Sequence, residues 1–271
     1  MTKTDRSLGA ENVSLPPELE AHAQVLRDRV FESTRYLPQF ELLLEDLAEL
    51  RAEVRSDQVV VSLERMILYG KNLFSPYFSH CRYVSLDSSP TSADERGAYN
   101  ARLVDDPRFV EVPCESRRCP PEKLEFDTAT ADFVLIPNLV HHVRDQSGLW
   151  REAARVLKPG GTLYVFEPTL RELHQIPDDY LRYTPSGMQV AIERFGLQTS
   201  RVKTTGGPFT AIAYCWNQAL QYIEPEERAK WETWFSGHFE ELVGLEVRYP
   251  TNQVRKFTSF PTAFSLRAVK A

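Results

Sequence analysis

The chain has 271 residues, of which 42% are hydrophobic and 26% are charged, and its formal net charge is −6. This length accommodates one large α/β domain with an extension, or two small domains. An acidic chain lacks the broad lysine and arginine surface that attracts nucleic acid or a membrane, so we expect neither as a partner. The first 14 residues carry no apolar core for a signal peptide, and no apolar run approaches the roughly 18 residues that span a bilayer. We therefore expect a cytoplasmic protein.

The four cysteines have no spacing that suggests a structural role. Cys81, Cys114, Cys119 and Cys215 form no C-x-x-C pair, and none has metal-ligand spacing with a histidine. We expect reduced thiols instead of a disulfide, and we expect no bound metal ion.

The N-terminal segment has a helical pattern. In residues 18–55 apolar side chains mostly recur at steps of three or four residues, as they do along the buried face of a helix. Pro38 interrupts this pattern and predicts two helices instead of one. We place a helical cap at residues 1–57 and an α/β domain at residues 58–271.

From residue 58 onward, strands and helices alternate. Short apolar runs predict strands at residues 59–63, 82–86, 109–112, 132–136, 162–166, 197–204 and 257–269. Helical stretches lie at residues 71–78, 94–103, 148–157, 184–195, 208–223 and 224–245. This alternation implies right-handed crossovers, so the sequence predicts a doubly wound, mostly parallel α/β sheet of seven strands.

The most informative stretch lies in the middle of the chain. Residues 131–145 read ADFVLIPNLVHHVRD, and residues 150–168 read WREAARVLKPGGTLYVFEP. Pro159 stops a helix, and Gly160 and Gly161 permit the positive φ of a turn into the next strand. A generic helix-to-strand turn has such glycines too. The whole stretch in this order, however, resembles the small-molecule class I S-adenosylmethionine-dependent methyltransferases of the type 11 group.

The resemblance implies a Rossmann-like fold, S-adenosylmethionine as cofactor, and a small-molecule substrate such as a sugar or a natural-product intermediate. It implies that Asp87, after the second strand, hydrogen-bonds the ribose hydroxyls, with Ser88 in the same turn; otherwise Asp87 merely caps that turn. Asn138 and Leu139 follow the fourth strand, where the family brackets adenine. Glu115 is expected near the adenine amino group, or else as an exposed loop carboxylate.

The glycine-rich cofactor loop of this family is altered. The family pattern is D-x-G-x-G-x-G, whereas the chain reads SLERMILYG from Ser62 to Gly70. When Ser62 is aligned with the aspartate of this pattern, the three glycine positions are occupied by Glu64, Met66 and Leu68. Gly70 then lies two residues beyond the last glycine position. Either a rebuilt loop binds the cofactor through Leu63, Glu64 and Gly70, with Glu64 reaching its ammonium, or the scaffold has lost the cofactor.

The candidate catalytic residues are His142 and, second to it, His141. Methyl transfer is an in-line displacement in which positioning supplies most of the rate, and an imidazole can accept a proton from the acceptor near neutral pH. The alternative is that these rings pack against the sheet. Arg182 and Tyr183 line the acceptor pocket or simply begin a helix, and Glu167, at the end of the fifth strand, is a further acceptor-site candidate.

Other functions compete with methyl transfer. A chain that has lost the cofactor would act as a binding or partner subunit, or would catalyse a reaction other than methylation. A nicotinamide-dependent dehydrogenase shares the acid after the second strand but also needs the glycine turn. The sequence leaves the acceptor and the oligomeric state open, and both a homodimer and a complex with a protein partner are compatible with it.

Overall fold

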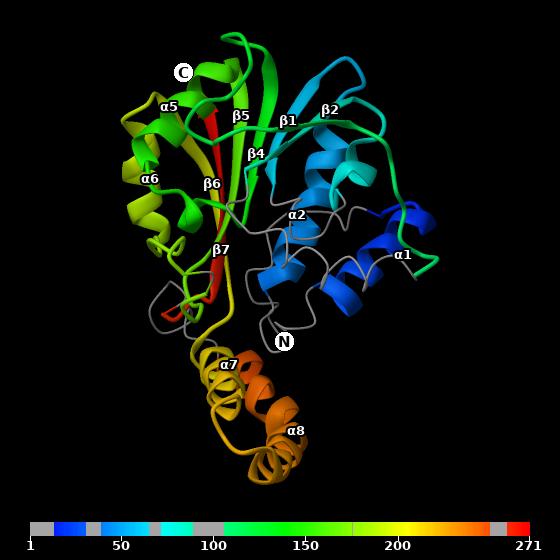
Figure 1. The fold of residues 1–271 in the computed structure, drawn as a ribbon, viewed down its shortest axis with the longest axis vertical. Helices are drawn as coiled ribbons and strands as arrows, with labels where there is room; N and C mark the ends of the chain where they lie inside the picture. Colours follow the sequence, from blue (N-terminus) through cyan, green and yellow to red (C-terminus); the bar gives the residue numbers. More distant parts are fainter. Residues whose placement is uncertain (1–13, 31–38, 65–71, 89–105, 175, 250–258) are drawn as a thin grey trace.

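One seven-stranded sheet organises the molecule. The structure, a computed structural model, describes residues 14–30, 39–64, 72–88, 106–174, 176–249 and 259–271. Its strand order is β3-β2-β1-β4-β5-β7-β6. All neighbouring strands are parallel except β7, which is antiparallel to both β5 and β6. The predicted doubly wound, mostly parallel sheet is therefore confirmed (Figure 1).

The elements have the following bounds. The strands are β1 Val59–Glu64, β2 Arg82–Asp87, β3 Glu115–Arg118, β4 Ala131–Pro137, β5 Leu157–Pro168, β6 Leu197–Thr205 and β7 Ala263–Lys270. The α-helices are α1 Pro17–Val25, α2 Gln39–Glu53, α5 Gln146–Val156, α6 Pro185–Glu193, α7 Pro208–Leu220 and α8 Pro225–Arg248. A π-helical turn, η1, spans Leu26–Val30, and two 3₁₀ turns are η3 Ser75–Phe78 and η4 Val140–His142.

The prediction of the third strand is wrong. No strand forms at residues 109–112, and β3 begins only at Glu115. The Phe109 ring packs against the ring of His22 on α1, with centroids 4.8 Å apart, and the Val110 amide donates to Nδ1 of His22 at 3.1 Å. The apolar alternation that suggested a strand therefore reflects packing of a loop against α1.

Two helical predictions also differ from the structure. Residues 72–78 contain only the short turn η3, because Pro76 cannot donate the amide hydrogen bond of a longer helix. The predicted helix at residues 94–103 lies outside the described residues. In the turn after α5, Gly160 has φ +75°, as expected. The helix ends at Val156, and Lys158, beyond its end, pairs with Asp132.

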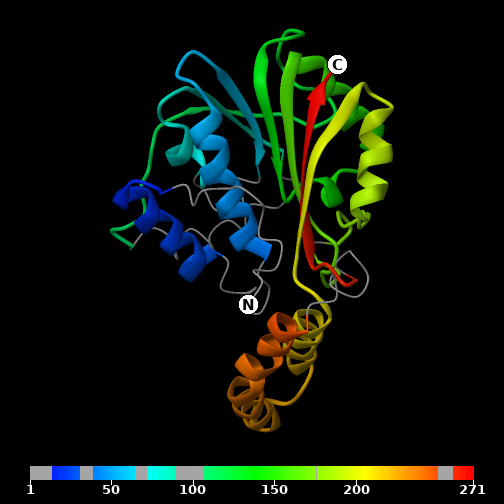
Figure 2. The same ribbon diagram turned by 180° about the vertical axis from the view of Figure 1, so that it is seen from behind.

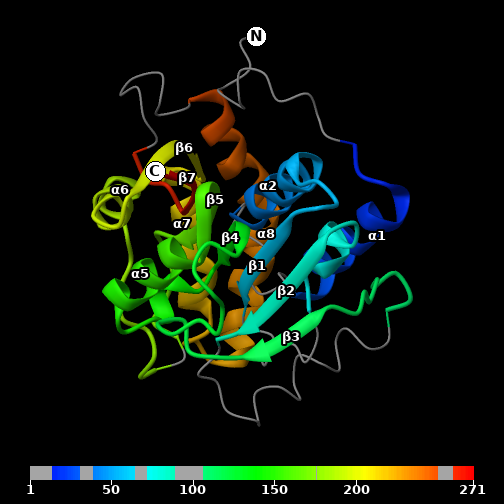
Figure 3. The same cartoon turned by 90° about the horizontal axis from the view of Figure 1, so that it is seen from above.

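Helices cover both faces of the sheet. On one face α2, with α1 and η3, packs over side chains of β1, β4 and β5, such as Val60, Phe133 and Tyr164. On the other face α5 and α6 cover Val134 and Val165 (Figures 1 and 3). Because the central strands are buried on both faces, they are almost continuously apolar, which is why they were predictable.

Ion pairs join α2 to the last strands of the sheet. Asp46 is only 1% exposed, and its carboxylate accepts from Lys203 Nζ at 2.6 Å and from the Tyr164 hydroxyl at 3.1 Å. Glu49 pairs with Lys203, Arg201 and Arg267 at 2.9, 2.8 and 3.1 Å. The N-terminal helices are thus tied directly to the sheet, and a division of the chain at residue 57 stays a prediction.

The helices α7 and α8 form a hairpin that projects beyond the sheet (Figures 1 and 2). It leaves the sheet where β6 ends at Thr205, and therefore from the edge that holds the carboxyl ends of the parallel strands. The Trp216 ring packs against Trp231, Trp234 and Phe235 within the hairpin. In the described part of the chain, no helix is long and apolar enough to cross a membrane.

Candidate functional site

The carboxyl ends of β1 and β2 place two acidic residues side by side. Glu64 and Asp87 are register partners at the last position of the two strands. The chain is held there by three hydrogen bonds: the Ser88 amide donates to the Glu64 carbonyl at 3.0 Å, the Cys119 amide donates to the Asp87 carbonyl at 3.3 Å, and Ser88 Oγ donates to the Cys119 carbonyl at 3.0 Å. Crevices at this edge are where open parallel sheets bind ligands.

A cavity of about 410 Å³ opens at this edge, which is within the size range of small-ligand sites. Asp87 and Ser88 line it from the end of β2, and Cys119 lines it from the end of β3. His142, after β4, and Tyr180, after β5, contribute the opposite wall. The structure therefore brings three of the predicted site residues, Asp87, Ser88 and His142, into one cavity.

Glu64 and Leu63 have different surroundings. The Leu63 side chain is fully buried in the hydrophobic core, so it serves packing and offers no side-chain contact to a cofactor. Glu64 is 3% exposed, and its carboxyl accepts a short hydrogen bond from the Tyr83 hydroxyl. Burial raises the pKa of Glu64 to about 7, although the hydrogen bond from Tyr83 acts in the opposite direction. Gly70 lies outside the described residues.

The chain turns sharply after β4. Asn138 has φ +58°, a left-handed conformation that asparagine tolerates better than most residues, and its amide donates to the Phe166 carbonyl at 2.7 Å. The Leu139 side chain is fully buried in the core, and a contact of Leu139 with adenine stays a prediction. The turn leads directly into η4, which carries both predicted histidines.

Glu167, at the end of β5, holds this turn in place. Its Oε1 accepts from the Val140 amide at 2.6 Å, and its Oε2 accepts from the His141 amide at 3.3 Å. The same Oε2 lies 2.6 Å from Nδ1 of His141, and one proton is shared between these two atoms. Burial raises the pKa of Glu167 to about 8. The hydrogen bonds from the Val140 and His141 amides favour the charged carboxylate and therefore act in the opposite direction.

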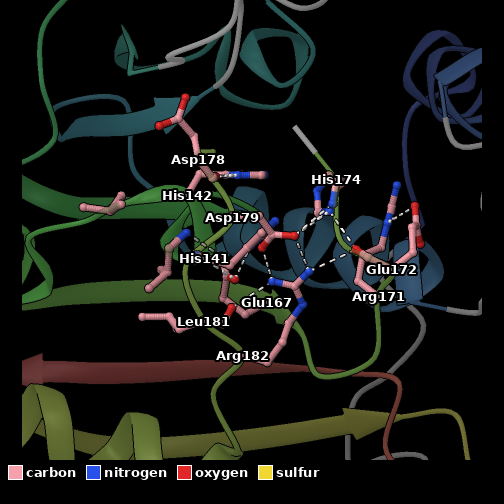
Figure 4. A network of polar contacts seen from close by, with 12 residues as sticks. His141, His142, Glu167, Arg171, Glu172, His174, Asp178, Asp179, Leu181 and Arg182 are labelled. Atoms are coloured by element: carbon pink, nitrogen blue, oxygen red, sulfur yellow. Dashed lines mark hydrogen bonds and ion pairs between the residues drawn. The ribbon is translucent and has the colours of Figure 1, made fainter. Parts of the chain in front are cut away.

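The loop after β5 folds back onto the two histidines. The Tyr180 amide donates to the His141 carbonyl at 2.9 Å, and Nδ1 of His142 donates to the Asp178 carbonyl. The loop also brings in His174, whose ring centroid lies 5.3 Å from that of His141 and 4.9 Å from that of His142. Figure 4 shows how residues from the ends of β4 and β5 and from this loop form one polar network.

Asp179 anchors that loop. Its side chain is 1% exposed and pairs with Arg182 and with Nδ1 of His174, the latter at 3.2 Å. Although burial alone would raise it, the pKa of Asp179 is held well below its usual range by Arg182 and by the His174 amide, which donates at 3.0 Å. Burial and the charge of Arg171 lower the pKa of His174.

Three further predicted site residues lie elsewhere or are otherwise engaged. Glu115 begins β3, so its expected position after that strand is wrong, and it forms ion pairs with Arg82 and Arg117; a contact with adenine stays a prediction. Arg182 is bound to Asp179, which makes it part of the loop's scaffold. Tyr183 is half-buried and packs against the core ahead of α6, where Thr184 caps the helix.

Sequence reasoning missed His174, Asp179 and Cys119. Cys119 follows β3, so the correct strand would have pointed to it. His174 and Asp179 carry no periodic signal, and only the folded loop brings them to the histidine pair. The four cysteines, all among the described residues, are free thiols as expected.

Solved structures share this architecture. A proposed sarcosine dimethylglycine methyltransferase from Galdieria sulphuraria is 15% identical, with a TM-score of 0.50, over 85% of this chain and 84% of that one. A geranyl diphosphate methyltransferase in complex with S-adenosylmethionine is 13% identical, also with a TM-score of 0.50, over 96% of this chain and 94% of that one. At these identities the likeness concerns the fold. It defines the class: a Rossmann-like α/β domain of the methyltransferase type.

The sequence identifies the family within that class. Residues 68–165 match the profile of a family described as "Methyltransferase domain". Residues 68–165 therefore carry the sequence pattern of an S-adenosylmethionine-dependent methyltransferase domain, and the predicted resemblance is confirmed. The matched range begins after β1, so Glu64 lies outside it. No protein among the curated sequences matches the chain.

The donor set fits the family's cofactor. A carboxylate at the carboxyl end of β2 is the group that can accept hydrogen bonds from two ribose hydroxyls, and Asp87 opens onto a cavity of ligand size. The residues that would hold S-adenosylmethionine there are Asp87 and Ser88 at the ribose and Cys119 beside them. Their backbones are already fixed by hydrogen bonds to one another.

Proposed function

We propose that the chain transfers a methyl group from S-adenosylmethionine to a small metabolite, such as a sugar or a natural-product intermediate. One observation carries this proposal: Asp87, the candidate ribose ligand, and His142, the candidate base, line the same cavity. When bound, the cofactor supplies an electrophilic methyl group on a sulfonium. The chain's own contribution is to fix cofactor and acceptor in line.

His142 suits the role of a base if the acceptor is a hydroxyl or an amine that must lose a proton. Its Nδ1 donates to the Asp178 carbonyl, and this hydrogen bond sets the tautomer in which the lone pair is on Nε2. Its Nε2 is then the atom that takes the proton. His141 shares a proton with Glu167 behind it, so we assign His141 a positioning role.

Glu64 and Asp87 end β1 and β2 at the same level, which suggests a different alignment of the altered loop. If Glu64 takes the position of the acid in D-x-G-x-G-x-G, then Met66 and Leu68 replace the first two glycines and Gly70 supplies the third. In this alignment Gly70 is in place instead of two residues late. We propose that Glu64 faces the methionine end of the cofactor.

Calorimetric titration of the full chain with S-adenosylmethionine tests the proposal. We expect saturable binding, weakened at least tenfold in Asp87→Asn, since a hydrogen bond to a charged group contributes about 1.5–3 kcal/mol. The matched control is Asp57→Asn, which changes an exposed acid before β1 and should bind like the wild type. The absence of heat at millimolar cofactor, with protein that is folded by circular dichroism, would refute the proposal.

A second function is favoured by Met66 and Leu68 themselves. Two bulky residues at glycine positions crowd the path by which a backbone approaches the cofactor. A chain without cofactor binding would serve as a partner subunit or act on its ligand without methylation. This alternative would be supported by a ligand that binds in the cavity and is not displaced by S-adenosylmethionine.

A further inference from the structure

Three histidines meet at the end of β4. His141 and His142 come from the turn η4, and His174 comes from the loop after β5. One ring nitrogen of each lies within 4.8 Å of one ring nitrogen of each of the other two. Figure 4 shows the rings gathered at one place in the polar network. From this convergence we propose that the three histidines bind a divalent transition metal ion, with zinc as the leading candidate.

The surroundings of the rings are those of histidines that bind metal. Each Nδ1 is held by an oxygen: that of His141 by Glu167, that of His142 by the Asp178 carbonyl, and that of His174 by the Glu172 carbonyl at 3.0 Å. Such outer contacts fix the ring orientation and make the opposite nitrogen a better ligand. A metal ion therefore binds at Nε2 of each ring.

The geometry requires only a small adjustment. Nitrogen ligands lie about 2.1 Å from zinc, so in a tetrahedral site they are about 3.4 Å apart. Rings whose ligand atoms lie within 4.8 Å of one another must close in by roughly 1 Å. His174 can make most of this movement, because it is the only one of the three that is half-buried on a loop, whereas His141 and His142 are 1% and 5% exposed.

Two acidic side chains contact the ligand rings. Glu167 contacts His141, and Asp179 contacts His174, so acidic groups stand directly behind two of the three ligands. Arg182 is bound to the Asp179 carboxylate, and Arg171 is close enough to lower the pKa of His174, so charges of both signs surround the cluster. Three neutral imidazoles leave one position of a tetrahedral zinc ion for water or substrate, which is the pattern of a catalytic site and not of a closed structural one.

The proposed metal site adjoins the cavity of the proposed cofactor site. His142 lines the cavity that Asp87 shares, so an ion on this ring lies beside the proposed cofactor site. A metal on Nε2 of His142 takes the lone pair that the proposed function uses for a general base, so with the ion bound His142 is a ligand and not the base. The acceptor would then be a group that coordinates zinc, such as a hydroxyl or a thiol. This last step rests on the proposed function, but metal binding itself does not.

The test is metal content and affinity of the full chain without cofactor or substrate. Protein dialysed against zinc and then against metal-free buffer should retain one zinc per chain by mass spectrometry. His174→Ala should weaken zinc binding at least 100-fold in a competitive chelator titration. The control His238→Ala removes an exposed histidine on α8 and should leave binding unchanged.

Cobalt(II) provides a second readout that does not depend on activity. Bound to three nitrogens and a water in tetrahedral geometry, it should show visible absorption bands that His174→Ala abolishes and His238→Ala retains. Circular dichroism and thermal melting establish that the variants are folded. Asp179→Asn, which weakens both the support of His174 and the ion pair with Arg182, should weaken zinc binding about 10–100-fold. The proposal is overturned by substoichiometric zinc in the folded wild type, or by His174→Ala binding zinc like the wild type. If the wild type binds zinc but does not bind S-adenosylmethionine, the proposed function is overturned and the metal site is not.

Discussion

At the residue scale, Glu64 and Asp87 show how the same chemical group takes different roles at adjacent strand ends. The two carboxyl groups stand at the same level of the sheet, but Glu64 is 3% exposed whereas Asp87 is half-buried and lines a cavity. A buried carboxyl group loses hydration, and this disfavours its charged form. Glu64, like Glu167, is therefore a residue whose protonation links the site to the stability of the fold.

This difference predicts a pH dependence of stability. The pKa of Glu64 is about 7 in the folded chain, against 4.5 as its ordinary value, so between these limits the folded state binds more protons than the unfolded state. The stability contributed by the protonated group is present below pH 4.5 and is lost as the pH rises through 7. At about 1.4 kcal/mol for each pKa unit, the loss is about 3 kcal/mol.

Urea unfolding of the wild type and Glu64→Gln at pH 5 and pH 8 measures this loss. The wild type should lose about 3 kcal/mol more than the glutamine variant between the two pH values. Glu240→Gln, which alters an exposed acid on α8, should behave like the wild type. Identical pH dependence in the wild type and Glu64→Gln would contradict the assignment.

At the element scale, the α7–α8 hairpin is stabilised by its own helix cap. The N-cap residue of α7 is Gly207, which has no side chain with which to cap the helix. Glu246 on α8 takes that role: its Oε2 accepts from the amides of Phe209 and Thr210 at 2.8 and 3.1 Å. A Cβ at Gly207 would lie 2.1 Å from Oε1 of Glu246, so glycine is what allows this carboxylate to approach.

We predict that Glu246→Ala loosens the hairpin without affecting the sheet. Losing a carboxylate from a helix N-terminus costs about 1–2 kcal/mol, and amides of α7 should then exchange with solvent about tenfold faster. Amides of β4 and β5 should exchange at their wild-type rates, as hydrogen exchange with mass spectrometry can show. Glu241→Ala on the same helix is the control, and equal acceleration in both variants would argue against the cap.

At the scale of the whole molecule, the sequence predicted the layers well and the loops poorly. Buried strands such as Val59–Glu64 are recognisable because both faces of the sheet are covered, whereas the strand order comes from the structure. Phe109 misled the prediction, since its partner is His22 on a distant helix. His174 was missed for the same reason: its position beside His141 exists only once the loop has folded.

The site was predictable to a similar degree. Asp87 and His142 stand at strand ends, where position along the chain determines position in space, and the structure places both in one cavity. Leu63 and Leu139 occupy neighbouring positions, but their side chains belong to the core, because apolar residues at a strand end are drawn into the nearest packed layer. Sequence position alone does not say which way such a side chain turns.

The most direct test of the central claim is a crystal structure of the full chain grown with S-adenosylhomocysteine. The account predicts that the ligand lies beyond the carboxyl ends of β1, β2 and β4, with both ribose hydroxyls within hydrogen-bonding distance of the Asp87 carboxylate. A chain whose Met66 and Leu68 side chains fill that space, with no ligand bound at saturating concentration, would contradict the account.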